Sequence, residues 1–263
     1  MRPLNTSEMS PSKTNTSSAS TLGASTLENG EIDSLPNLRL YLDTADTAAW
    51  ERWLPTGMFY GVTCNPLLLE RAGVDCTPST LKSLAQRAFD LGMQEVHLQA
   101  WGESTATLLN IGNLLSSFDQ RIVVKLPATR EGTIAAKLLV RSGIPVTLTA
   151  VYSIRQVLIA AAIGASYVAP YLGRIDDSGR DGFAEVATMQ QVLKGVKSTT
   201  RVLTASIRNI EDIPELAEHG LDTFTFSDAI AQAFFDVPET IEATAEFERA
   251  ANSAVIITAD DTG

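Results

Sequence analysis

The residue that most clearly could take part in chemistry is a lysine enclosed in an apolar run. Lys125 lies within Ile-Val-Val-Lys-Leu-Pro, which spans 122–127. Burial disfavours a charged amine, so we expect the pKa of Lys125 to fall below the ordinary lysine value of about 10.4. A neutral amine can attack a carbonyl carbon and form a Schiff base. The alternative is a side chain that only extends its ammonium group from the strand end into solvent.

Other polar residues stand at the ends of further apolar runs. Together with Lys125, the set comprises Asp43, Thr63, Asn65, Gln99, Thr149, Tyr171, Arg174, Ser206 and Arg208. If the runs are parallel strands of a barrel, their carboxyl ends form one mouth, where catalytic groups of such barrels sit. A carboxylate there can act as general acid or base, and guanidinium groups offer paired donors to phosphate oxygens. The joint position of these residues favours an active site.

Several of these residues also have an ordinary structural interpretation. The alternatives are a helix cap near Asp46 for Asp43, a turn before Pro66 for Asn65, a satisfied polar residue of the barrel mouth for Gln99, pairing with Asp176 or Asp177 for Arg174, and a surface charge for Arg208.

The elements that must position these residues are eight short apolar runs that alternate with helical segments. The predicted strands are Leu38–Leu42, Gly61–Thr63, Glu95–Ala100, Ile122–Leu126, Pro145–Thr149, Ser166–Pro170, Arg201–Ala205 and Thr223–Phe226. Such runs are typical of parallel strands buried on both faces. Strict alternation with helices predicts an α/β fold, a single (β/α)8 TIM barrel. The alternative is an open doubly wound sheet, but the glycine-rich phosphate turn that usually follows its first strand is missing after Asp43.

Helix boundaries are also predicted between these runs. One helix is expected over Gly132–Arg141, with Gly143 as its stop. A second is expected over Ile154–Ile163, capped by Ser153 and ended by Gly164.

Residues 1–36 differ in composition from the rest of the chain. They are rich in Ser, Thr and Asn and hold few large apolar side chains. Such a segment buries too little surface to offset the entropy of ordering. We therefore expect a disordered N-terminal tail over 1–36 and one barrel domain over 37–263. The tail lacks the apolar segment of a secretory signal, and its acidic residues argue against a transit peptide.

The net charge of −11 narrows the classes of partner. An acidic surface repels nucleic-acid phosphates and anionic lipid, so we expect neither as a partner. No apolar run reaches the roughly 18 residues of a membrane span. The two cysteines, Cys64 and Cys76, and the two histidines have no zinc-ligand spacing. We expect no metal, and free thiols in a reducing, cytoplasmic setting.

Six segments of the chain have the order and residues of a known set of motifs. They are Leu-Tyr-Leu-Asp-Thr-Ala at 40–45, Gly-Val-Thr-Cys-Asn-Pro at 61–66, Val-Val-Lys-Leu-Pro-Ala-Thr-Arg-Glu-Gly at 123–132, Thr-Ala-Val-Tyr-Ser at 149–153, Ala-Pro-Tyr-Leu-Gly-Arg-Ile-Asp at 169–176 and Thr-Ala-Ser-Ile-Arg-Asn at 204–209. With them the chain resembles the transaldolase family, which includes the fructose-6-phosphate aldolases, from about 38 to about 250. The resemblance implies a Schiff-base (class I) aldolase that acts on sugar phosphates without cofactor or metal.

The resemblance also implies a role for each residue. These roles are imine formation for Lys125, acid–base chemistry at the scissile bond for Asp43, binding of donor hydroxyls for Thr63 and Asn65, placement of a proton-relay water for Gln99, Thr149 and Tyr171, and phosphate binding for Arg174, Ser206 and Arg208.

Two positions bear on the reaction within the family. Transaldolases usually carry Glu where this chain has Gln99 and Phe where it has Tyr171, whereas fructose-6-phosphate aldolases carry Gln and Tyr. We therefore expect an enzyme like fructose-6-phosphate aldolase, which uses a dihydroxyacetone donor unit. The Arg208-Asn209 pair favours the alternative, a transaldolase of the pentose phosphate pathway. A non-catalytic sugar-phosphate-binding barrel is a third possibility. Small family members form pentamers and decamers, so the resemblance also implies a homo-oligomer.

Overall fold

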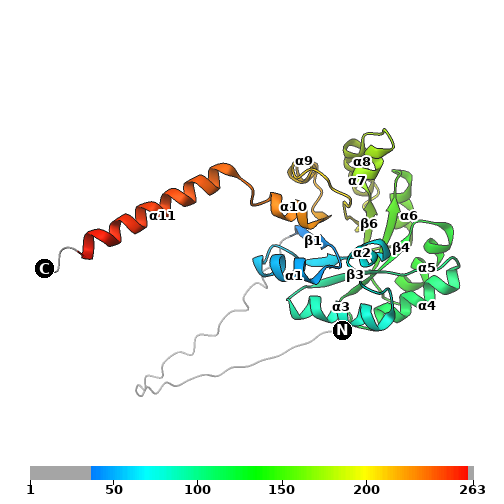
Figure 1. Ribbon diagram of the computed structural model, residues 1–263. Coiled ribbons are helices and arrows are strands. Elements are labelled where there is room, and N and C mark those ends of the chain that lie inside the picture. The colour runs from blue at the N-terminus through cyan, green and yellow to red at the C-terminus, as the bar shows by residue number, and fades with distance from the viewer. Residues whose placement is uncertain (1–36, 260–263) are drawn as a thin grey trace, which may run out of the picture. The chain divides into compact units, whose positions relative to one another are not determined.

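The computed structural model describes residues 37–259, and the side chains of residues 37–252. The segment predicted to be a tail, residues 1–36, lies outside the described residues. Eight parallel strands form one sheet in the order β7-β6-β5-β4-β3-β2-β1-β8 (Figure 1). They are β1 (Arg39–Asp43), β2 (Gly61–Thr63), β3 (Glu95–Gln99), β4 (Ile122–Pro127), β5 (Val146–Val151), β6 (Tyr167–Pro170), β7 (Arg201–Val202) and β8 (Thr223–Phe226).

The sheet closes into a barrel between β7 and β8. The regular part of β7 is short, but the chain beyond it continues to pair. The Thr204 N–H donates to the carbonyl of Thr223 at 3.0 Å, and the Thr225 N–H donates to the carbonyl of Thr204 at 2.9 Å. This parallel bridge joins the two ends of the sheet. The predicted (β/α)8 barrel is confirmed, and the open doubly wound sheet is excluded.

Helices connect successive strands around the barrel, and the last two helices follow β8 (Figure 1). They are α1 (Thr47–Trp53), the 3-10 turn η1 (Leu54–Thr56), α2 (Pro66–Arg71), α3 (Pro78–Asp90), α4 (Thr105–Ser116), α5 (Arg130–Arg141), α6 (Arg155–Ile163), α7 (Leu172–Asp177), α8 (Gly182–Gly195), α9 (Asp212–Glu218), α10 (Asp228–Ala233) and α11 (Pro238–Ala259). Three strands, β2, β6 and β8, are each followed by two helices, of which the first (α2, α7 or α10) is short.

Two layers of core hold the barrel together. The outer layer lies between helices and strands, where helix α5 buries Ala135, Ala136 and Leu139 completely. Full burial of one leucine side chain stabilises the fold by about 2 kcal/mol. Small residues allow the close approach of helix and strand: a Cβ on Gly132 would lie 2.0 Å from the carbonyl oxygen of Pro127. The inner layer fills the barrel with the rings of Tyr41 and Tyr167 and neighbouring apolar side chains.

The predicted ends of α5 and α6 are confirmed, but α5 begins at Arg130 and not at the predicted Gly132. The predicted stops are present, since Gly143 and Gly164 have φ values of 79° and 77°. The predicted cap of α6 by Ser153 is wrong. The helix begins after Ile154, which makes no side-chain cap. Instead, the amide oxygen of Gln156, inside the first turn, accepts from the backbone N–H groups of Tyr152 (2.9 Å) and Ser153 (3.0 Å). The first-turn N–H groups that a cap would serve donate to backbone carbonyls: Gln156 to Ser153 at 2.9 Å and Val157 to Ile154 at 3.2 Å, so no hydroxyl cap is needed.

Candidate active site

A pocket of about 380 Å³ opens at the carboxyl ends of the strands. This is the end of a parallel barrel at which catalytic groups are found, and the volume falls in the range of small-molecule sites. The sequence-predicted residues that line it are Asp43, Asn65, Gln99, Lys125, Tyr171, Arg174 and Ser206. Three further predicted residues, Thr63, Thr149 and Arg208, do not line the pocket.

Lys125 lies near the carboxyl end of β4 and lines the pocket while almost fully enclosed, with 4% of its surface exposed. Its strand neighbours fix its position: Lys125 is in register with Gln99 of β3 and with Thr147 of β5. The Ala100 N–H donates to the Lys125 carbonyl at 2.9 Å. A rigid, paired backbone therefore holds one amine against the pocket.

Asp43 at the end of β1 is oriented by a pair of threonines. The Thr63 hydroxyl donates to Asp43 Oδ1 at 2.5 Å, and it lies 2.6 Å from the hydroxyl of Thr225. Because the proton of Thr63 is used on the carboxylate, Thr225 must donate to Thr63. Thr63 is completely buried. The structure thus places Thr63 behind Asp43 as its partner, and not on the pocket wall.

Asn65 both caps a helix and lines the pocket, so its structural role and its expected role in ligand binding are compatible. Its amide oxygen accepts from the backbone N–H groups of Leu67 (3.0 Å) and Leu68 (3.1 Å) and so caps helix α2. Asn65 also lines the pocket. The cap uses only the oxygen, which leaves the NH2 donors of the side chain for a ligand.

Aromatic side chains form the wall of the pocket beside β5 and β6. The Tyr171 hydroxyl lies 2.9 Å from the hydroxyl of buried Thr149. The ring of Tyr152 meets that of Tyr171 edge to face, with centroids 5.6 Å apart. The Arg174 guanidinium lies 5.1 Å from the centre of the Tyr171 ring and donates to the Tyr152 hydroxyl at 3.4 Å. Tyr152 was not singled out in the sequence, although it follows the end of β5 directly.

The structure does not bring Arg208 into the pocket. Its guanidinium makes two parallel hydrogen bonds of 2.5 Å to the carboxylate of Asp177. These bonds, together with the nearby positive charge, lower the pKa of Asp177. The side chains of Arg208 and Asp177 are both more than half exposed. The sequence had suggested Asp177 as a possible partner for Arg174, but the acid is taken by Arg208 instead.

Two pocket residues have strained backbones. Ala150 and Ser206 have φ values of 57° and 59°, in the left-handed region that side chains disfavour. Residues of this kind concentrate at functional sites. The chain comes close here: the Gly173 N–H donates to the Ser206 carbonyl at 3.0 Å, and a Cβ on Gly173 would lie 2.6 Å from that oxygen. Gly173 therefore allows α7, which carries Arg174, to approach the end of β7.

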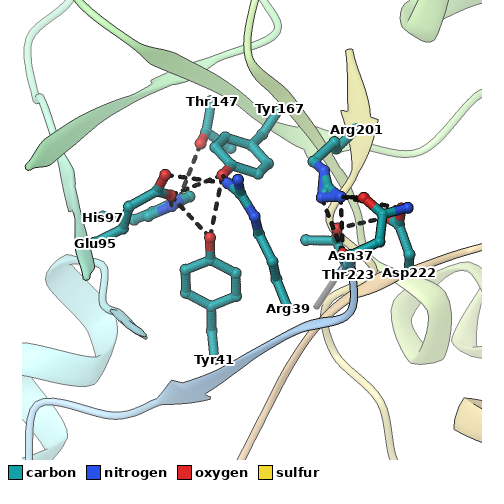
Figure 2. A network of polar contacts seen from close by, with 10 residues as sticks. All are labelled: Asn37, Arg39, Tyr41, Glu95, His97, Thr147, Tyr167, Arg201, Asp222 and Thr223. Atoms are coloured by element: carbon teal, nitrogen blue, oxygen red, sulfur yellow. Dashed lines mark hydrogen bonds and ion pairs between the residues drawn. The ribbon is translucent and has the colours of Figure 1, made fainter. Parts of the chain in front are cut away.

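A buried polar network occupies the barrel near the amino ends of the strands (Figure 2). Its centre is Glu95, which accepts from Arg39 (3.1 Å), Tyr41 (2.8 Å), Tyr167 (2.7 Å) and His97 (3.2 Å). We call these five residues the floor network. Burial alone would raise the pKa of Glu95, but the hydrogen bonds from His97 and the two tyrosines bring it below its ordinary value.

His97 contributes the imidazole ring of the floor network. It is completely buried, and this burial lowers its pKa although Glu95 opposes the shift. A carboxylate oxygen only accepts, so His97 Nε2 carries the proton towards Glu95. His97 Nδ1 then accepts from Thr147 at 3.0 Å. The ring is thus held neutral and in one tautomer.

The thiol of Cys64, which is buried close to the site, is unreactive. Burial raises the pKa of the Cys64 thiol to about 12, and a thiol that stays protonated neither attacks carbon nor binds metal well. Across residues 37–252 there is no group of three or more His, Cys, Asp or Glu side chains that could hold a metal ion. Within the described chain, no helix is both long and apolar enough to cross a bilayer.

Comparisons with known proteins match most of the chain to one family. The family model "Transaldolase/Fructose-6-phosphate aldolase" matches residues 40–261. A probable transaldolase of Phenylobacterium zucineum is 33% identical over 212 residues, which cover 80% of this chain and 94% of the relative. A probable transaldolase of Lactiplantibacillus plantarum is 34% identical over 210 residues, with the same coverage.

A likeness to a solved structure is one of fold alone. Thiamine phosphate pyrophosphorylase from Pyrococcus furiosus superposes with a TM-score of 0.51 at 14% sequence identity, over 74% of this chain and 88% of that one. At this identity the match speaks for the barrel and not for the chemistry carried at its mouth.

Proposed function

Because the chain belongs to the transaldolase/fructose-6-phosphate aldolase family and is an enzyme of the class I aldolase/transaldolase type, we propose that it cleaves and forms a carbon–carbon bond in sugar phosphates as a fructose-6-phosphate aldolase. The observation that carries the proposal is the single enclosed amine of Lys125, which lines the pocket together with Asp43, Gln99 and Tyr171.

The proposed reaction begins at Lys125. Its amine attacks the ketose carbonyl at C2, and loss of water gives an imine. Asp43 takes the proton from the C4 hydroxyl, the C3–C4 bond breaks, and glyceraldehyde 3-phosphate leaves. The electron pair of that bond passes into the imine as an enamine. Protonation at C3 and hydrolysis by water then release dihydroxyacetone and restore the amine.

The neighbouring polar groups fit the proton transfers of this scheme. The hydroxyls of Tyr171 and Thr149 are hydrogen bonded to each other, so one of them can hold a water molecule at the imine carbon while the other orients it. Gln99 faces the same pocket and offers a neutral amide beside that water. Arg174 and Ser206 are proposed to bind the phosphate. Arg208 can join them only if it leaves Asp177.

A transaldolase is the second candidate, in which an acceptor aldehyde, and not a proton, captures the enamine. The curated relatives bear the name probable transaldolase, and the Arg208-Asn209 pair favours it. A binding-only barrel would require the loss of a reacting group, yet Lys125, Asp43 and Thr149 are all present.

Product analysis with fructose 6-phosphate tests the proposal. We expect release of dihydroxyacetone without any acceptor, and at most a several-fold increase in turnover with erythrose 4-phosphate.

Tyr171→Phe removes the hydroxyl proposed to orient the hydrolytic water and is expected to lower acceptor-free cleavage by about tenfold, while transfer to erythrose 4-phosphate is affected less. Turnover that depends strictly on the acceptor in the wild-type enzyme would identify a transaldolase instead.

We also propose that the enzyme is a cytoplasmic homo-oligomer, a pentamer or decamer by its family. Large apolar side chains stand exposed near the C-terminal end: Phe235 (50%), Val237 (41%), Ile241 (59%) and Phe247 (71%). Large apolar side chains exposed on one segment of the chain can pack against a second copy, which favours association. Light scattering coupled to size exclusion is expected to give a mass of five or ten chains, and a monomer at micromolar concentration would contradict the assembly.

A further inference from the structure

One arginine of the pocket has no place in the reaction described above. Arg71 is the last residue of α2, the short helix that follows β2, and its exposed side chain lines the active-site pocket. It also lines an adjoining hollow of about 430 Å³, together with Asp43, Asp46 and Asp228. A cation in the last turn of a helix interacts favourably with the carboxyl end of that helix, but beside an active-site pocket it can also bind the neighbouring acids or a ligand.

Each of the acids beside Arg71 accepts a hydrogen bond from another group. Asp46 accepts from the backbone N–H of Ala48 at 2.9 Å, and Asp43 accepts from Thr63. Asp228 accepts from Arg52 at 2.7 Å. Within the described residues, no carboxylate lies within the 4.0 Å that defines an ion pair with Arg71. Among the described side chains, Arg71 therefore has no ion-pair partner, and its guanidinium donors are open to a ligand.

The barrel places Arg71 opposite Arg174. In the closed order of strands, β2 and β6 are four steps apart in either direction, so they face each other across the barrel. Arg71 follows β2 and Arg174 follows β6, and both line one pocket. Lys125 on β4 lies midway between these strands. The pocket thus carries a guanidinium on each of two opposite walls, with the amine between them.

We propose that, besides fructose 6-phosphate, the pocket takes a ketose that carries an anionic group on each side of its reacting carbonyl, and that it binds this ketose more tightly, with one group on Arg174 and the second on Arg71. The class is a ketose with acidic groups at both ends, either two phosphates or a phosphate and a carboxylate. Guanidinium groups bind both kinds of anion through paired, charge-assisted hydrogen bonds. This inference rests on the proposed function, since it takes Lys125 as the reacting centre.

Binding of three unreactive ligands with six-carbon chains tests the proposal. Glucitol 6-phosphate carries one anion, glucitol 1,6-bisphosphate carries two phosphates, and 6-phosphogluconate carries a phosphate and a carboxylate. Dissociation constants are measured by calorimetry in 0.15 M salt, which screens non-specific attraction. We expect at least one ligand with two anionic ends to bind about tenfold more tightly than glucitol 6-phosphate, which is the effect of one charge-assisted contact. The tighter of the two identifies the second group.

Two variants assign this preference to Arg71. In Arg71→Gln the advantage of the second anion is expected to disappear. Arg141→Gln is the matched control, because Arg141 is also an exposed arginine that ends a helix, but it does not line the pocket. It is expected to keep the advantage. Equal affinities of wild type for all three ligands, or an advantage that survives Arg71→Gln, would overturn the inference.

Failure of this inference and failure of the proposed function are separable. The ligands have no carbonyl group, so their binding does not depend on imine formation. Borohydride trapping of wild-type enzyme with dihydroxyacetone, which has no anionic group, reports on Lys125 alone. A trapped adduct without the double-anion preference refutes only the second anionic site. If the enzyme prefers ligands with two anionic groups but no adduct is trapped, the Schiff-base reaction is refuted. The ligand would then not be a ketose that reacts in this pocket.

Discussion

Replacing Lys125 with methionine is expected to abolish covalent trapping of fructose 6-phosphate by borohydride and to lower kcat/KM on the order of 10⁴-fold, as loss of a covalent nucleophile does in other enzymes. Borohydride reduces an imine to a stable secondary amine, so the adduct survives digestion and mass spectrometry can locate it. Methionine has a similar length and shape, and it fills the space of a side chain that is 4% exposed. The fold should therefore persist.

Lys82→Met is the matched control for this experiment. Lys82 lies on the exposed face of α3, and its replacement is expected to leave both the adduct and the rate unchanged. An adduct on another lysine in the wild-type enzyme, or near-normal turnover by Lys125→Met, would rule out Lys125 as the residue that forms the Schiff base. Loss of the adduct in Lys125→Met alone, with a normal unfolding transition, would place the imine at this residue.

The features that could be predicted from the sequence are those that depend on local pattern. Each strand of the barrel was expected within a few residues, because continuous apolar runs bounded by turns mark buried parallel strands. The carboxyl end of a strand is then known from chain direction alone. This is why Asp43, Gln99 and Lys125 were expected in one pocket before their distances were known.

The features that could not be predicted depend on side-chain choice among distant partners. Arg208 was expected at the phosphate, but nothing local tells that Asp177, 31 residues away, takes its guanidinium. Arg71 was overlooked because it ends an extra helix and not a strand. The floor network joins Glu95 to Arg39 and Tyr167, which lie 56 and 72 residues from it in sequence. Barrel register alone brings them together.

Replacing Glu95 with alanine is expected to lower the free energy of unfolding by about 2–4 kcal/mol at pH 7.5. The carboxylate accepts from Arg39, His97 and two tyrosines inside the barrel (Figure 2). Its removal leaves a largely enclosed guanidinium and two buried hydroxyls without their acceptor. Urea denaturation followed by tryptophan fluorescence measures the change, since Trp50 is almost completely buried.

Glu51→Ala provides the comparison for this loss. Glu51 pairs with Arg87 at 2.6 Å on the surface, where both side chains are about half exposed. An exposed pair contributes less than about 1 kcal/mol, because water screens the charges and both side chains lose freedom. If Glu95→Ala costs no more than Glu51→Ala, the floor network does not stabilise the barrel.

The pH dependence of the free energy of unfolding distinguishes loss of the floor network from general damage to the core. Burial lowers the pKa of His97 below its ordinary 6.5, so the unfolded chain takes up a proton first. The free energy of unfolding therefore falls as the pH drops below about 6.5. The pKa of Glu95 lies below its ordinary 4.5, so its stabilisation is present above that pH and is lost below it. In Glu95→Ala the decline that begins near pH 6.5 should remain, because His97 stays buried, whereas the slope below pH 4.5 should become shallower. A variant whose profile runs parallel to that of wild type throughout would show that Glu95 is not held ionised by its neighbours.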